Sequence, residues 1–176
     1  MSRRSSNVQR SRWAVGLLDL QPTDRMLEVG CGPGVALLAA KSVAATVVGV
    51  DRSPVMVRQA RRRAGVTVHE ADAEHLPAFD APFDKALAVN TVGHWSDPVA
   101  GLEAVRAVLR DSGTIAVVAQ PRNPGATEAD SAAAAEATVR LVQEAGFVDP
   151  RVETLALDPP AVCVLATRQP GRPTDT

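Results

Sequence analysis

Cysteine is scarce in this sequence. The 176 residues include only Cys31 and Cys163, which lie far apart and belong to no Cys-x-x-Cys or histidine-rich pattern. A disulfide framework is therefore excluded, and no metal site is expected. Because disulfides are typical of oxidising compartments and none is predicted here, the expected location is cytoplasmic.

Aromatic residues, lysine and net charge are also low. Aromatic residues make up 3% of the chain, the only lysines are Lys41 and Lys85, and the formal net charge is −1. There is no basic patch with interleaved aromatic residues, so nucleic acid is not an expected partner. A membrane is not expected either, because no apolar run is long enough to span a bilayer.

The N-terminal stretch MSRRSSNVQRSRW is basic but lacks the apolar segment of a secretory signal. Residues 1–6 are predicted to be disordered, and near-helical spacing of apolar residues predicts a helix over 7–20. We interpret the arginines of this stretch as a solvated helix face, with phosphate contact as the alternative. These arginines are Arg3, Arg4, Arg10 and Arg12.

Short apolar segments alternate with helical patterns along the chain, which predicts a parallel sheet covered by helices on both faces. The expected strands are residues 25–30, 46–51, 66–72, 84–90 and 114–120. Two further segments, RVETLAL and VCVLATR, flank Asp158 and two prolines and are expected to pair as an antiparallel hairpin. The predicted organisation is one domain over 7–168, followed by a disordered tail over 169–176.

Several helix starts carry capping signals. Ser53 precedes a proline, Asp97 also precedes a proline, and Thr127 with Asp130 resembles a capping box. Gly146 is the expected C-terminal cap of the last helix. These signals predict helices over 53–63, from Asp97 to about 109, and over about 128–145.

Three glycines alternate in the stretch EVGCGPG, directly after the first predicted strand. Gly30, Gly32 and Gly34 permit positive φ angles, and without a Cβ they let a ligand approach the main chain. In a parallel sheet of this kind, ligands bind beyond the carboxyl ends of the strands. The following helix offers free N–H groups, so a nucleotide-like molecule is the expected ligand.

The spacing excludes two common nucleotide motifs. The dinucleotide fingerprint G-x-G-x-x-G fails because Val35 stands at its sixth position, and the P-loop fails because no G-K-[ST] follows. Acidic residues instead end successive strands. Glu28 precedes the glycines, Asp51 is placed to accept ribose hydroxyls, and Asp72 could accept from an adenine amino group. The alternative for Asp51 and Asp72 is simple helix capping.

These motifs resemble the class I S-adenosylmethionine-dependent methyltransferases, in particular their small-molecule, methyltransferase type 11-like branch. The resemblance rests on MLEVGCGPG, VVGVDRSPVM, EADAEHLP, FDKALAVN and GHWSDPVAGLEAVRAVLRDSGTIAVV, in that order, over roughly 24–168. It implies an α/β, Rossmann-like doubly wound sheet with strand order 3-2-1-4-5-7-6. It also implies S-adenosyl-L-methionine as cofactor and S-adenosyl-L-homocysteine as product.

The resemblance further implies which residues hold the cofactor. Glu28 would bind the methionine amino group, Asp51 the two ribose hydroxyls, and Asp72 the adenine amino group. Arg52 and Met56 would flank the adenine, although Met56 could be an ordinary core residue. The remaining expected cofactor contacts are Gly30, Cys31, Gly32, Gly34, Ala73 and Asn90, with no catalytic role for the cysteine.

Methyl transfer from a sulfonium needs mainly proximity and alignment, and a general base only when the acceptor must lose a proton. His94 is the candidate base, and the alternative is that it merely orients the following helix. Trp95 is either a substrate wall or a packing residue, and Arg122 is expected at the rim of the substrate site. An N/D-P-P-Y/F motif after the fourth strand and the cysteines of arsenic methylation are both missing, so a small metabolite is the expected acceptor.

The sequence has no lid insertion, so the site is expected to be open, covered by residues 1–20, or completed by a second subunit in a homodimer. Two other functions stay open at this point. The chain could be a non-catalytic, regulatory S-adenosylmethionine-binding protein. A nicotinamide-dependent (NAD) oxidoreductase is the weaker alternative, because the dinucleotide fingerprint fails.

Overall fold

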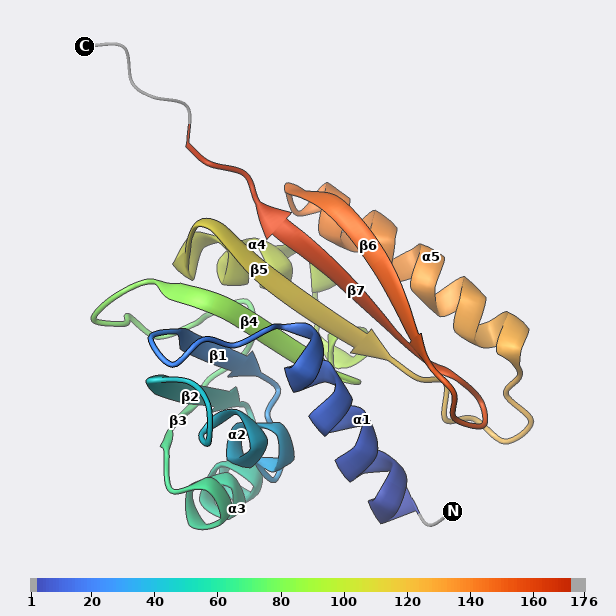
Figure 1. The fold of residues 1–176 in the computed structure, drawn as a ribbon, viewed down its shortest axis with the longest axis horizontal. Helices are drawn as coiled ribbons and strands as arrows, with labels where there is room; N and C mark the ends of the chain where they lie inside the picture. The colour runs from blue at the N-terminus through green and yellow to red at the C-terminus, as the bar shows by residue number, and fades with distance from the viewer. Residues whose placement is uncertain (1–2, 172–176) are drawn as a thin grey trace.

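The computed structural model describes residues 3–171. Helices and strands alternate over most of that range, as Figure 1 shows. In chain order the elements are α1 (Arg3–Leu17), β1 (Arg25–Val29), α2 (Val35–Ala40), β2 (Thr46–Asp51), α3 (Pro54–Ala64), β3 (Thr67–Glu70), β4 (Phe83–Val89), the 3-10 helix η1 (Val92–His94), α4 (Pro98–Val108), β5 (Leu109–Ala119), α5 (Glu128–Glu144), β6 (Phe147–Leu155) and β7 (Ala161–Arg168).

The strands form one sheet in the order β3-β2-β1-β4-β5-β7-β6. The first five strands run parallel, whereas β7 pairs antiparallel with both β5 and β6. Both the predicted strand order and the closing hairpin are therefore confirmed. The sheet twists across the molecule from β6 at one edge to β3 at the other (Figure 1).

Helices cover both faces of the sheet because successive side chains of a strand point to opposite faces. In β1, Met26 packs into a core cluster with α1, α2 and α3, and the next residue, Leu27, packs into a second cluster with α4 and α5. Both side chains are fully buried. This two-sided burial explains why the strands read as continuous apolar runs rather than alternating ones.

The predicted caps form at three helices. The Ser53 side chain accepts a hydrogen bond from the Met56 N–H at 3.4 Å, and Asp97 accepts from the Ala100 N–H at 3.0 Å. The capping box joins Thr127 and the third residue of α5. The C-terminal cap residue of α5 is Ala145 rather than the predicted Gly146, and Gly146, with φ 83°, follows it in the left-handed conformation that ends the helix.

Some boundaries differ from those predicted. Helix α1 begins at Arg3 rather than at residue 7, and β5 begins at Leu109 rather than at 114. Strand β3 ends at Glu70, so Asp72 lies in the loop beyond the strand rather than at its end. The predicted disorder of residues 1–2 and 172–176 falls outside the described residues.

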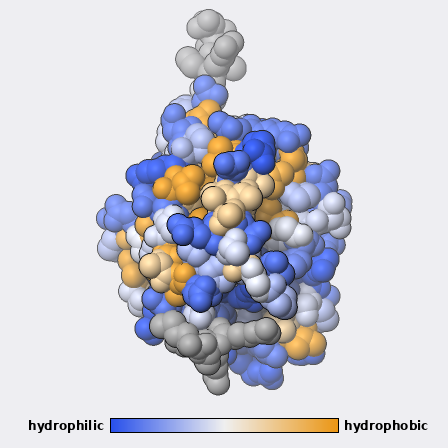
Figure 2. Space-filling model, turned by 90° about the vertical axis from the view of Figure 1, so that its right-hand side faces the viewer, coloured by the Kyte–Doolittle hydropathy of each residue, from blue (hydrophilic) through white to orange (hydrophobic). Residues whose placement is uncertain are grey.

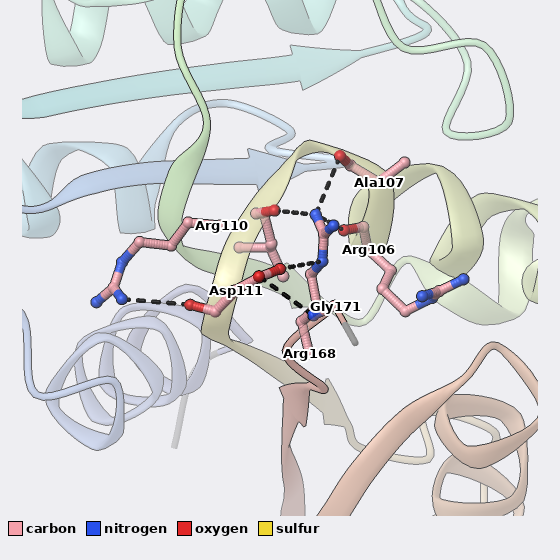
Figure 3. A network of polar contacts seen from close by, with 7 residues as sticks. Arg106, Ala107, Arg110, Asp111, Arg168 and Gly171 are labelled. Carbon is pink, nitrogen blue, oxygen red and sulfur yellow. Dashed lines mark hydrogen bonds and ion pairs between the residues drawn. The ribbon is translucent and has the colours of Figure 1, made fainter. Parts of the chain in front are cut away.

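Arg168 joins the carboxyl end of α4 to the C-terminal strand (Figure 3). Its guanidinium donates to the carbonyl oxygens of Arg106 at 3.1 Å and Ala107 at 3.3 Å, and also to that of Leu109. An ion pair with Asp111 at 3.5 Å holds the guanidinium in place. The last carbonyls of a helix have no hydrogen-bond partner within the helix. Arg168 supplies the donors for these carbonyls of α4.

We expect Arg168→Ala to lower the free energy of unfolding by about 1–3 kcal/mol, because it removes charge-assisted hydrogen bonds to carbonyls that lie partly buried. Arg140→Ala is the matched control: Arg140 is 69% exposed and its ion pair with Glu136 spans 3.9 Å. That control should cost no more than about 0.5 kcal/mol. Urea denaturation of the two variants measures both values, and equal losses would contradict the capping role of Arg168.

Candidate functional site

The glycine loop lies between β1 and α2, at the edge of the sheet where the parallel strands end. The register aligns Val29 of β1 with Val50 of β2, so the residues that follow them, Gly30 and Asp51, emerge side by side. The Gly30 N–H donates to the Val50 carbonyl at 2.8 Å.

Figure 2 turns the right-hand side of Figure 1 toward the viewer, and hydrophilic residues predominate there while hydrophobic residues form separate patches.

The three glycines of the loop all have positive φ angles, 72° at Gly30, 51° at Gly32 and 79° at Gly34, but they serve different purposes. A Cβ on Gly30 would come within 2.0 Å of the Thr91 Oγ1, and one on Gly34 within 2.9 Å of the Ala60 Cα. These two glycines make room for neighbouring parts of the protein. A Cβ on Gly32 would meet no described atom within 4 Å, so Gly32 presents its main chain to open space.

The Asp51 carboxylate ties the glycine loop to the start of α3. Its Oδ2 accepts a hydrogen bond from the Gly32 N–H at 2.8 Å, and its Oδ1 accepts from the Ser53 N–H at 2.9 Å. A carboxylate oxygen can accept more than one hydrogen bond, so both oxygens keep capacity for a ligand. Asp51 therefore orders the local backbone and can still receive hydroxyl groups.

Glu28, the last residue but one of β1, is 3% exposed. Among the described residues its Oε2 has no hydrogen-bond partner. Burial raises the pKa of this carboxyl well above its ordinary value; a hydrogen bond from the Leu37 backbone opposes that rise, and the nearby charge of Asp51 adds to it. Burying a carboxylate costs free energy when one of its oxygens has no hydrogen-bond or charge partner. A cationic group of a ligand would supply the missing partner of Glu28.

Two cavities meet at Gly30 and Thr91. The smaller cavity has a volume of about 80 Å³ and its lining includes Asp51, Arg52, Asp72, Ala73, His94 and Trp95. The larger has a volume of about 400 Å³ and its lining includes Arg10, Glu28, Cys31, Gly32, Asn90 and Arg122. Met56 is not among the lining residues of either cavity. Most of the predicted site residues are thus gathered along one continuous hollow.

Asn90 follows β4 with a φ of 52°, a conformation that asparagine tolerates better than most residues. Its Oδ1 accepts a hydrogen bond from the Gln120 N–H at 2.7 Å. Its Nδ2 is buried and has no partner in the range of residues described. Because Asn90 lines the larger cavity, this nitrogen is a free donor available to a ligand there.

His94 and Trp95 lie on the smaller cavity and not on the larger one. His94 is exposed, and its backbone N–H closes the short η1 turn by donating to the Thr91 carbonyl at 2.8 Å. The indole N–H of Trp95 donates to the Thr91 Oγ1 at 3.2 Å, and the ring packs where a Cβ on Gly101 would otherwise stand. Trp95 is therefore held by packing, and Thr91 is a site residue that the sequence analysis missed.

Arg10 corrects the prediction of a solvated helix face. It is 1% exposed and lines the larger cavity. Its guanidinium donates to the Gln120 Oε1 at 2.5 Å and to the Asn7 Oδ1 at 2.8 Å, whereas its Nε has no partner in the described structure. Burial, together with the nearby positive charge of Arg122, lowers the pKa of Arg10 to about 10, so the group remains a cation near neutral pH.

A signal for the burial of Arg10 was present in the sequence. Arg10, Ala14 and Leu18 follow one another at intervals of four, which places them on one stripe of a helix. Ala14 and Leu18 are buried in the core, and Arg10 extends their stripe to the cavity. A charged residue in register with an apolar stripe is the pattern that would have identified it.

The Cys31 side chain packs in the core cluster, although Cys31 is also a lining residue of the larger cavity. It is 4% exposed and packs against Gly49, where an added Cβ would lie 3.0 Å from its Sγ. Burial raises the pKa of the thiol above its ordinary value, so the thiolate is disfavoured. In residues 3–171 no cluster of three or more histidine, cysteine or acidic side chains could hold a metal ion, and no helix there is long and apolar enough to cross a membrane.

Comparison with known proteins gives a consistent result. A family model described as a methyltransferase domain matches residues 26–113. The Bacillus subtilis methyltransferase YdaC is 26% identical over 93% of this chain and 94% of its own length. A solved S-adenosylmethionine-dependent methyltransferase from Thermotoga maritima superimposes with a TM-score of 0.70 at 25% identity, covering 93% of this chain and 89% of that one.

A further relative is named for the pathway in which it works. A ubiquinone biosynthesis O-methyltransferase from Cereibacter sphaeroides is 35% identical over 105 residues, which is 57% of this chain. The match covers 42% of that enzyme, so this chain spans less than half of its length. The similarity thus concerns a shared domain rather than the whole enzyme.

The different surroundings of the glycines predict different costs of substitution. Gly32→Ala should destabilise the fold by only about 1–2 kcal/mol, the cost of a left-handed conformation for a residue with a Cβ. Gly34→Ala carries the same cost and also forces a Cβ against Ala60, which adds about 1–3 kcal/mol. Urea denaturation checks the order of the two losses. A loss in Gly32→Ala as large as that in Gly34→Ala would show that the space beside Gly32 is not open.

Proposed function

Because this chain belongs to the class I S-adenosylmethionine-dependent methyltransferases, we propose that it transfers the methyl group of S-adenosyl-L-methionine to a small metabolite. The observation that carries the proposal is the open main chain of Gly32, whose N–H binds the Asp51 carboxylate and which lines the same cavity as the buried Glu28, with its unpartnered Oε2. An elongated ligand with hydroxyl groups at one point and a cation at another matches this arrangement.

The adenosine part of the cofactor is assigned to the smaller cavity. Asp51 would receive the ribose hydroxyls, since both of its oxygens keep acceptor capacity while the Gly32 and Ser53 N–H groups fix their position. Asp72 and Ala73 line the same cavity and would contact the adenine. The volume of about 80 Å³ is small for an adenine, so this end of the site has to widen when the ligand binds.

The amino acid part of the cofactor is assigned to the larger cavity, because that part carries both charges of an amino acid. Glu28 would accept from the ammonium group, and Arg10 would donate to the carboxylate through its unpartnered Nε. The free Nδ2 of Asn90 is a second donor. Each of these buried groups lacks a partner in the protein, and a zwitterionic ligand supplies the complementary charges.

When bound, the cofactor would supply a methyl group activated by its sulfonium, with the uncharged thioether as the leaving group. Glu28, Arg10 and Asp51 would hold the cofactor so that this methyl group is aligned with the acceptor atom. We propose His94 as the general base that takes the proton of an O–H or N–H acceptor; its exposed side chain lies on the smaller cavity, three residues after Thr91, which lines both cavities.

Two observations support a small metabolite as acceptor. The C. sphaeroides relative is named as an enzyme of ubiquinone biosynthesis, which makes a small molecule. The larger cavity, to which helix α1 contributes Asn7, Arg10 and Ser11, has a volume of about 400 Å³, which suits a small molecule rather than a polymer. A homodimer that completes the open site stays part of the proposal.

Asp51→Asn should weaken the binding of S-adenosyl-L-homocysteine about tenfold or more, because an amide cannot replace both carboxylate acceptors. Calorimetry measures the dissociation constant, with thermal denaturation of the unliganded variant as a check that it is folded. Asp80→Asn is the matched control, since Asp80 is 82% exposed and pairs with Arg25 away from both cavities. Unchanged affinity in Asp51→Asn would refute the ribose assignment.

Glu28→Gln should make the unliganded protein more stable and bind the cofactor less tightly. The folded state holds the pKa of Glu28 above its unfolded value, so it binds the proton more tightly than the unfolded chain. Stability is therefore lost as the pH rises from about 4.3 through the raised folded pKa. Urea denaturation between pH 4 and pH 8 should show that the free energy of unfolding falls less with rising pH in Glu28→Gln than in the wild type. Identical pH profiles, or undiminished affinity for S-adenosyl-L-homocysteine, would contradict the role of Glu28.

A further inference from the structure

A third cavity, of about 250 Å³, adjoins the larger cavity and shares Arg10 and Arg122 with it. It lies between α1, the loop after β5 and the turn between β6 and β7. Gln120, Asn123 and Asp158 also line it. Because the larger cavity is assigned to the amino acid end of the cofactor, this adjoining space is where an acceptor can reach the methyl group.

The side chain of Gln120 is engaged with the protein in this cavity. Its Oε1 accepts from Arg10 at 2.5 Å, and its Nε2 donates one of its two N–H groups to the Pro159 carbonyl at 2.7 Å. Gln120 thus holds Arg10 in place. Arg122 differs, because it forms no ion pair with any residue between 3 and 171 and is exposed to the cavity. Beside the neutral amides of Gln120 and Asn123, Arg122 therefore offers an incoming molecule a cationic donor.

The charges around the cavity do not balance without an acceptor. Glu28 and Arg10 are matched by the two charges of the cofactor's amino acid end, if the proposed function holds. Arg122 then remains without an ion pair, close enough to Arg10 to lower its pKa, and Asp158 is the opposing charge in the same cavity. The sulfonium of the cofactor adds a positive charge nearby, so the charges around this space sum to a net positive value that favours an anion.

We infer that the methyl acceptor carries an anionic group, a carboxylate or a phosphate, which Arg122 binds in this third cavity. The inference rests on the proposed function and adds the chemical class of its substrate. A guanidinium binds either anion through two parallel hydrogen bonds, which also orients the nucleophilic atom toward the larger cavity. The volume of about 250 Å³ suits a small organic acid or phosphate ester.

Asp158 is the acidic residue that lines the same cavity, and it works against an anion. It is exposed, and it makes no ion pair with Arg122 in the structure as described. Its charge therefore weakens anion binding without neutralising Arg122. This opposition gives a second test, because removing the Asp158 charge should have the opposite effect to removing that of Arg122.

The experiment uses the full chain saturated with S-adenosyl-L-homocysteine, so that the amino acid end of the cofactor already occupies Glu28 and Arg10. The probes are benzoate, its neutral isostere benzamide, and inorganic phosphate, titrated by calorimetry at constant ionic strength. Benzoate and phosphate should bind, and benzamide should bind at least about tenfold more weakly than benzoate. Comparing the two anions shows which one the cavity prefers.

Arg122→Gln should raise the dissociation constants of both anions about tenfold or more, and Asp158→Asn should lower them. Arg140→Gln is the matched control, since it removes an exposed arginine of α5 that lines none of the three cavities and should change neither constant. Equal binding of benzoate and benzamide, or no effect of Arg122→Gln, would overturn the inference. If S-adenosyl-L-homocysteine itself fails to bind, the proposed function fails instead, so the two failures are distinguishable.

Discussion

Two buried side chains, the carboxyl group of Glu28 and the guanidinium of Arg10, face one cavity without pairing with each other, and the proposed function depends on this arrangement. Glu28 projects from β1 and Arg10 from α1, and each retains an atom without a partner among the described residues. Burying such groups costs free energy that a protein built only for stability would avoid. The fold accepts that cost because the zwitterionic end of a ligand can satisfy both charges at once.

At the opposite end of the sheet, one polar cluster is paired within the protein. There the guanidinium of Arg168 meets the last carbonyls of α4 and the Asp111 carboxylate, and these groups satisfy one another. The Nε atoms of Arg25 and Arg106 at that end nevertheless lack partners among the described residues, so unpartnered atoms alone do not mark a site. Glu28 and Asn90 differ because they also line a cavity.

Much of the fold could be predicted from the sequence, because apolar runs, capping residues and glycines act locally. The caps at Ser53 and Asp97 followed from such signals, whereas the strand order came from the resemblance to a known family. Asp51 was identified as a ligand-facing acid, but its bonds to Gly32 and Ser53 depend on how two strands align. Arg10 was misassigned because its burial depends on α1 packing over the sheet, a contact between residues far apart in the chain. The separate purposes of the glycines were hidden for the same reason: Thr91 and Ala60 approach them only in the folded protein.

The central claim is that Glu28 and Arg10 together receive the amino acid end of S-adenosyl-L-methionine. A crystal structure of the complex with S-adenosyl-L-homocysteine tests it most directly. The account predicts the ligand's amino nitrogen within hydrogen-bonding distance of the Glu28 carboxylate and its carboxylate within the same distance of the Arg10 guanidinium. A complex in which the amino acid end lies elsewhere, with Glu28 and Arg10 still unpartnered, would contradict the account.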